Sequence, residues 1–149
     1  MRVMPDVIHD QNLLVANPGD NARQVAKAMV ERRISSILVL DDGGKLIGIV
    51  TERDFTRCFA VQGVDPDLTT AGDIMTSEVE TLSPDDSAFA ALELMELRNF
   101  RHLPVVDDSG RPLGIVSIRD LYAVVTRESR DVLLKTQTYL FDDRYNPDM

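Results

Sequence analysis

Cysteine, histidine and tryptophan are scarce in this sequence, which has one cysteine (Cys58), two histidines (His9 and His102) and no tryptophan. A single cysteine cannot form a disulfide within the chain and is typical of a reducing compartment, so we expect a cytoplasmic protein. Two separated histidines do not give the ligand spacing of a zinc site, and no metal site is expected. A Cys-His or Ser-His-acid pairing and a GxxxxGKS or GxxxxGKT phosphate loop are also missing. We therefore expect that the protein is not an enzyme.

Positive charge and long apolar runs are scarce as well. Asp and Glu outnumber Lys and Arg by 25 to 16, which gives a formal net charge of −9. Proteins that bind long nucleic acids need a surplus of cations to neutralise phosphates, so no such partner is expected. No apolar run approaches the roughly 18–20 residues of a membrane helix, and Pro5, Asp6 and His9 interrupt the stretch where a signal peptide would be apolar. No membrane association is expected.

The sequence repeats itself. Residues 34–55 and 100–121 align without a gap at an offset of 66, and the alignment extends back to Val15 and Thr81. Of the 41 aligned pairs (55 − 15 + 1), 14 are identical. A repeat at a fixed offset predicts two structural units of the same kind. We divide the chain into copy one (residues 1–66), copy two (residues 67–126) and a C-terminal extension (residues 127–149).

The sequence of each copy predicts the element order β-α-β-β-α. The first helix of each is expected to begin at Asn17 or Ser83, because each precedes a proline and an acid follows in the first turn. The helix of copy two is apolar over a wider arc and should be the more buried. Asp/Gly-rich turns indicate a hairpin in each copy. The strands are expected at residues 13–16, 37–40, 46–50, 79–82, 103–106 and 113–116, and the second helices from Thr51 and Ser117.

Two such units predict an α/β (α+β) module. A three-stranded sheet with helices on one face leaves its other face bare, so the copies should pack about a pseudo-two-fold axis, joined by residues 61–70. The extension is expected to be partly helical, through Leu134, or flexible. Its later residues are more apolar than a free tail requires, which suggests docking on the module, on a second subunit or on a client protein; they are Tyr139, Leu140, Phe141 and Tyr145.

Candidate binding residues lie where the last strand of each copy meets the following helix. The motif is Thr51-x-x-Asp54 in copy one and Ser117-x-x-Asp120 in copy two. A Ser or Thr followed three residues later by an acid is a capping-box variant, which is a structural role. A helix N-terminus can also bind an anion. The residues alone leave both interpretations open.

Three segments carry a resemblance to a known family: RHLPVVD from Arg101, the Gly-Ile-Val-Thr/Ser-x-Arg-Asp block of each copy, and DIMT from Asp73. Together they resemble a tandem pair of cystathionine-β-synthase (CBS) domains, and residues 51–76 resemble the stand-alone bacterial type. The resemblance implies a regulatory module that binds an adenosine-containing ligand, with AMP, ADP or ATP favoured, in clefts between the copies. It implies that Asp54 and Asp120 hold ribose hydroxyls and that Thr51 and Ser117 lie near the phosphate.

The resemblance also ranks the two sites. Basic residues just before the second strand meet phosphates in related modules; copy two has Arg101 and His102 there, whereas copy one has Ser35 and Ser36. The Ser117 site is therefore the one where we first expect a nucleotide to bind. The Thr51 site then either uses Arg101 from across the interface, binds a less charged ligand or stays empty.

The remaining candidate nucleotide contacts are Ile34 and Ser35, expected to line the base pocket of copy two through backbone contacts, and Ile115. The favoured function is thus a ligand sensor that requires no cofactor beyond its regulatory nucleotide and forms a homodimer, with a client protein as a possible partner. The alternative is an adaptor that mediates dimerisation or protein interaction without a ligand.

Overall fold

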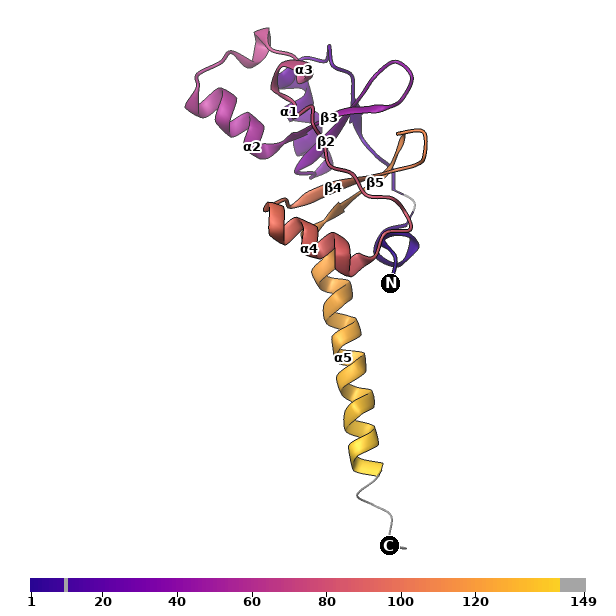
Figure 1. Cartoon of the computed structure of the whole chain (residues 1–149). Coiled ribbons are helices and arrows are strands. Elements are labelled where there is room, and N and C mark those ends of the chain that lie inside the picture. The colour runs from indigo at the N-terminus through magenta and orange to yellow at the C-terminus, as the bar shows by residue number, and fades with distance from the viewer. Residues whose placement is uncertain (10, 143–149) are drawn as a thin grey trace, which may run out of the picture.

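The structure, a computed structural model, describes the backbone of residues 1–9 and 11–142, and the side-chain surroundings of these residues except 133, 134 and 136–142. Helices and strands are mixed, in an α+β arrangement (Figure 1). In chain order the elements are η1 (Val3–Val7), β1 (Val15–Ala16), α1 (Ala22–Arg32), β2 (Ser36–Leu40), β3 (Leu46–Thr51), α2 (Glu52–Phe55), η2 (Thr56–Val61), η3 (Pro66–Leu68), α3 (Ala71–Ile74), α4 (Ala88–Arg98), β4 (His102–Val106), β5 (Pro112–Ser117) and α5 (Ile118–Asp142).

The two sheets follow the repeat. In copy one β1 pairs in parallel with β2, which pairs antiparallel with β3. In copy two β4 and β5 form the equivalent hairpin, and the predicted strand at residues 79–82 is reduced to one bridge between Leu82 and Val105. Both hairpin turns place a glycine at positive φ, 80° at Gly44 and 84° at Gly110, where a side chain would be strained. The predicted hairpins are confirmed.

The predicted start of the first helix in each copy is wrong by four residues. The N-caps are Asn21 and Ser87, whose side chains accept hydrogen bonds from backbone N–H groups three residues later. The Asn17 N–H instead donates to an Asp20 carboxylate oxygen (2.8 Å), and the Asp20 N–H donates to the Asn17 carbonyl (3.0 Å). These bonds close a turn in which proline takes the second position, so the same residue pattern forms a turn before the helix.

Helix α4 is not more buried than α1. Both helices bury the same three aligned positions, Ala22, Val25 and Met29 in α1 and Ala88, Ala91 and Met95 in α4. Of the additional apolar side chains of α4, Leu92 and Leu94 are only partly buried against the core, whereas Phe89 is 48% exposed and Leu97 78% exposed. The wider apolar arc therefore does not deepen the burial of this helix in a single chain.

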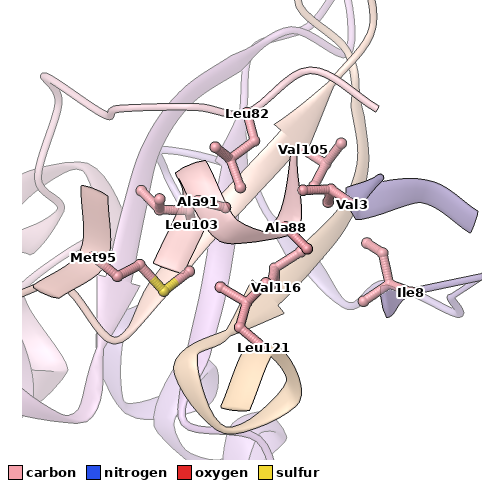
Figure 2. Packing of buried hydrophobic residues seen from close by; sticks show 10 residues of the cluster. All are labelled: Val3, Ile8, Leu82, Ala88, Ala91, Met95, Leu103, Val105, Val116 and Leu121. Carbon is pink, nitrogen blue, oxygen red and sulfur yellow. The ribbon is translucent and has the colours of Figure 1, made fainter. Parts of the chain in front are cut away.

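The cores of the two copies exchange their opening segments. Val3 and Ile8, from the start of copy one, belong to the core cluster of copy two, and Figure 2 shows Val3 next to Val105. The opening helix of copy two, α3, packs instead in the core of copy one. Backbone hydrogen bonds fix both crossings, from the Val3 N–H to the Asp86 carbonyl and from the Ala22 N–H to the Thr69 carbonyl (2.8 Å each). The division at residue 66 therefore separates the two sequence repeats, whereas each hydrophobic core contains residues from both sides of it.

Helix α5 joins copy two to the extension without a break. It starts at Ile118, buries Leu121 completely and continues to Asp142, past the end predicted at Leu134. Figure 1 shows it extending away from the sheets. The side chains of Tyr139, Leu140 and Phe141, and all of Tyr145, lie outside the described residues.

Two further residue environments bear on the sequence analysis. His9 is exposed. Cys58 is a buried free thiol in the core of copy one, against which Phe55 and Phe59 pack. Among the described residues, no helix combines the length and the apolar character needed to cross a membrane.

Candidate functional site

Two clefts lie where the copies meet, and each combines residues of both. The Ser117 cleft, of about 400 Å³, places Ser117 and Asp120 opposite the start of β2. The Thr51 cleft, of about 480 Å³, places Thr51 and Asp54 opposite the start of β4. Both volumes lie in the range of small-molecule sites. The Ser117 cleft is lined by Gln11, Asn12, Leu13, Leu14, Arg33, Ile34, Ser35, Ser36, His102, Ile115, Ser117 and Asp120, and the Thr51 cleft by Ser35, Ile49, Thr51, Glu52, Arg53, Asp54, Arg57, Thr76, Asn99, Phe100, Arg101 and His102.

Ser117 and Asp120 form a reciprocal cap at the start of α5. The Ser117 N–H donates to Asp120 Oδ2 (3.2 Å), and the Asp120 N–H donates to Ser117 Oγ (3.1 Å). The capping interpretation of the sequence motif is therefore right for this helix. Asp120 is nevertheless exposed to the cleft. A carboxylate offers about four acceptor positions, so the cap leaves it able to accept bonds from a ligand.

Thr51 and Asp54 form the same motif with a different exposure. Asp54 Oδ2 accepts hydrogen bonds from the Thr51 N–H (2.8 Å) and the Thr51 hydroxyl (3.3 Å). Asp54 Oδ1 pairs with the Arg57 guanidinium (3.1 Å), and Asp54 is only 5% exposed. Three of its about four acceptor positions have protein partners, so a ribose that donates from both hydroxyls could bind Asp54 only if Arg57 moved.

Arg101 and His102 do not lie together in the Ser117 cleft, and this corrects the sequence-based expectation. Arg101 lines the Thr51 cleft, whereas His102 lines both clefts. The cause is the pseudo-symmetry, which places the strand start of each copy opposite the helix start of the other. Of the three alternatives for the Thr51 cleft, the structure matches the one in which Arg101 reaches across the interface.

Ile34 and Ser35 lie where the sequence predicted them, in the cleft with Ser117 and Asp120, and Ile115 lines the same cleft. Ser35 also lines the other cleft, and its Oγ is 3.0 Å from His102 Nε2. This hydrogen bond connects the copies at the boundary between the two clefts.

Burial lowers the pKa of His102 below its ordinary value of 6.5, and the nearby Arg101 cation acts in the same direction. The carboxylates of Asp120 and Glu52 oppose the shift without cancelling it. His102 is therefore neutral at pH 7, and it contributes hydrogen bonding and packing to the clefts, not a full positive charge.

Arginines are distributed unequally between the clefts. Arg53, Arg57 and Arg101 line the Thr51 cleft, and Arg33 lines the Ser117 cleft. The sequence analysis missed Arg33, which ends α1 in the left-handed region at φ 54°. Its aligned partner Asn99 ends α4 at φ 58°. Asn is a common left-handed cap, so that alignment is the signal by which Arg33 could have been placed at a helix end beside a cleft.

Residues 11–14, which lead into β1, also line the Ser117 cleft without having been predicted. They precede the aligned repeat, so the self-alignment could not identify them.

Within the described parts of the chain, no group of three or more His, Cys, Asp or Glu side chains is arranged to hold a metal ion.

Comparison with known proteins gives a consistent result. A family model described as CBS domain matches residues 6–61 and 71–127. A mitochondrial CBS domain-containing protein of Arabidopsis thaliana is 34% identical over 135 residues, which cover 88% of this chain and 65% of that protein. A solved structure of a CBS-domain protein from Burkholderia ambifaria is 31% identical with a TM-score of 0.75, covering 85% of this chain and 95% of that one.

A further solved structure contains ligands. It is a CBS domain pair in complex with 5′-methylthioadenosine and S-adenosyl-L-methionine, 26% identical with a TM-score of 0.75, and the match covers 86% of this chain and 98% of that one. The chain spans 36–65% of the length of four curated relatives that it matches.

Proposed function

Because the chain belongs to the CBS domain family and contains two of its domains in tandem, we propose that it is a regulatory module that binds an adenosine-containing ligand in the clefts between them. One observation carries the proposal. Each cleft joins the helix-capping acid of one copy to the strand start of the other, so a ligand in either cleft contacts both copies. The solved pair with 5′-methylthioadenosine and S-adenosyl-L-methionine supports the ligand class.

The Ser117 cleft is our first site for the nucleoside. Asp120 accepts hydrogen bonds from the ribose hydroxyls, because its carboxylate is exposed and only partly used by the cap. The Ser117 hydroxyl and the Arg33 guanidinium act as donors toward a phosphate. Ile34, Ser35 and Ile115 line the side of the cleft where the base lies.

The Thr51 cleft is suited to a more anionic ligand end. Its three arginines can donate to phosphate oxygens. For a ribose to bind Asp54, the Arg57 guanidinium must leave Asp54 and pair with a phosphate instead, so the Arg57–Asp54 ion pair is lost. AMP, ADP and ATP are accordingly the favoured ligands, with the longer phosphate chains favouring the Thr51 cleft.

Ligand binding regulates by favouring one arrangement of the copies. A ligand shifts such an equilibrium only by its differential affinity for the two states, and an occupant that bridges both copies has that property. We further propose that the protein is a cytoplasmic homodimer without catalytic activity and transmits the change to a client protein. The exposed Phe89 and Leu97 on α4 support an interface with a second chain.

The alternative, an adaptor without a ligand, has a specific observation in its favour. Both capping motifs are complete within the protein itself, as the bonds from the Thr51 and Ser117 N–H groups show. In that case the two acids would serve only to start helices.

Thermal unfolding with AMP, ADP, ATP, NADH and S-adenosylmethionine separates the two functions. A ligand at 100 times its Kd adds about 2.7 kcal/mol, which corresponds to a Tm increase of roughly 5–10 °C. We expect an increase with at least one of these ligands, reduced more by Asp120→Ala than by Asp54→Ala when each is compared with its own unliganded Tm. Asp108→Ala is the matched control, since Asp108 is exposed and lines neither cleft. No increase with any ligand would favour the adaptor, and equal reductions would overturn the ranking of the clefts.

A further inference from the structure

The Gln11 side chain occupies the outer edge of β5 inside the Ser117 cleft. The Ile115 N–H donates to Gln11 Oε1 (2.8 Å), and Gln11 Nε2 donates to the Ile115 carbonyl (3.2 Å). One carboxamide thus satisfies both backbone groups of a single residue. Gln11 and Ile115 both line the cleft, and Gln11 is exposed. The two hydrogen bonds therefore lie where a ligand can reach them.

The equivalent edge in copy one is closed differently. Ile49, which aligns with Ile115, exchanges two backbone hydrogen bonds with Thr76, from the Ile49 N–H to the Thr76 carbonyl (3.0 Å) and from the Thr76 N–H to the Ile49 carbonyl (2.9 Å). Opening that edge requires the main chain to move. In copy two only a side chain must rotate, which exposed residues do in picoseconds to nanoseconds. The edge of β5 is therefore the more easily opened of the two.

Gly114 makes the close approach of Gln11 possible. A Cβ at this position would lie 2.9 Å from Gln11 Oε1 and 2.7 Å from Ile8 Cδ1. The absence of a side chain thus lets the carboxamide lie against the strand. The same space is available to a flat group that replaces it.

The chemistry of the carboxamide identifies that group. Its oxygen accepts and its nitrogen donates side by side, which is the pattern that adenine presents with N1 and its 6-amino group on the Watson–Crick edge. Adenine can therefore replace both Gln11 bonds one for one and leave neither Ile115 group without a partner.

We propose that Gln11 is a gate residue of the Ser117 cleft, occupying the adenine position on Ile115 until the base displaces it. The proposal rests on the proposed function, because it requires an adenine ligand in this cleft. Gln11 then sets the affinity of the cleft by competition: every binding event must first break two protein hydrogen bonds.

Titration calorimetry with AMP and with ATP tests the gate in the full chain. Gln11→Ala removes the competitor, and we expect about five- to tenfold tighter binding, the equivalent of about one net hydrogen bond. Gln62→Ala, which changes another exposed glutamine that lines neither cleft, should bind as the wild type does. The gain should disappear when Asp120→Ala is added, because it belongs to the Ser117 cleft.

The possible failures are distinguishable. If the wild type binds and Gln11→Ala binds equally or more weakly, the gate is refuted and the sensor stands. If no protein binds either nucleotide, the gate fails, and the sensor fails with it only if ADP, NADH and S-adenosylmethionine also leave the Tm unchanged. Amide exchange of unliganded protein gives an independent readout: the Ile115 amide should exchange faster in Gln11→Ala than in Gln62→Ala, and an unchanged rate would show that the carboxamide does not protect it.

Discussion

Asp54→Ala and Asp120→Ala are expected to destabilise the protein by different amounts, although the two acids occupy the same position of the same motif. Asp120 is exposed, and its carboxylate closes one cap. Asp54 is 5% exposed and accepts from Thr51 twice while pairing with Arg57. The substitution therefore removes a different set of bonds in each copy.

The magnitudes follow from those bonds. Loss of a helix cap costs about 1 kcal/mol, which is the expectation for Asp120→Ala. In Asp54→Ala the same loss is joined by those of the ion pair with the half-exposed Arg57 and of the hydrogen bond from the Thr51 hydroxyl, each worth about 1 kcal/mol, so a total of about 3 kcal/mol is expected. For a chain of this size, about 3 °C in Tm accompanies each kcal/mol, which gives decreases of roughly 9 °C for Asp54→Ala and 3 °C for Asp120→Ala.

Urea unfolding followed by circular dichroism measures the two free energies of unfolding, with unchanged m values as the check that both states keep their compactness. Asp54→Asn should fall between wild type and Asp54→Ala, because its amide oxygen still accepts from the Thr51 N–H but no longer pairs with Arg57. Nucleotide binding should follow the opposite order, with Asp120→Ala losing more. Equal destabilisation by the two alanine variants would refute the assignment of a mainly structural role to Asp54.

Two further predictions concern pH and packing. Burial lowers the pKa of His102 below 6.5, so below that pH the unfolded chain binds more protons than the folded one and stability falls. Between pH 7.5 and pH 5.5 the free energy of unfolding should therefore decrease less in His102→Asn than in the wild type. An equal decrease in the two proteins would contradict the shift. Gly48→Ala would place a Cβ against the Met75 side chain and should lower the free energy of unfolding in urea by about 1–2 kcal/mol. The control Gly19→Ala has open space around its Cβ and should change stability by less than about 0.5 kcal/mol. If Gly48→Ala were as stable as Gly19→Ala, the Met75 side chain would be able to move away without cost.

The hairpins and the repeat could be read from the sequence because their signals are local. Gly44 and Gly110 lie at positive φ, which favours glycine, and the same turn sequence recurs 66 residues later. The helix starts were harder to place, because Asn17 and Ser83 before proline suit a helix cap and a turn equally well. The turn forms because the acid three residues later accepts the backbone N–H of Asn17 or Ser83.

The composition of the clefts could be predicted only in part. Thr51, Asp54, Ser117 and Asp120 were identified because the motif is contiguous and occurs twice. The partner residues come from the other copy, and sequence alignment does not say which strand start faces which helix start. Arg101 was therefore assigned to the wrong cleft. Gln11 was missed because its two hydrogen bonds span 104 residues of sequence.

The position of the Ser117 cap explains how an occupied cleft could be sensed at a distance. Ser117 ends β5, and Asp120 lies in the first turn of α5. Under the proposed function, a ribose that hydrogen-bonds to Asp120 contacts the residue that caps α5, so binding acts directly on the first turn of a helix 25 residues long. Such a helix extends about 37 Å, and a small rotation at its start moves its far end by several times the distance. The Thr51 cap precedes only the four-residue α2 and the six-residue η2. Under the proposed function the two clefts are therefore unequal as sources of a signal, because the cleft that contains Gln11 acts on the longer helix.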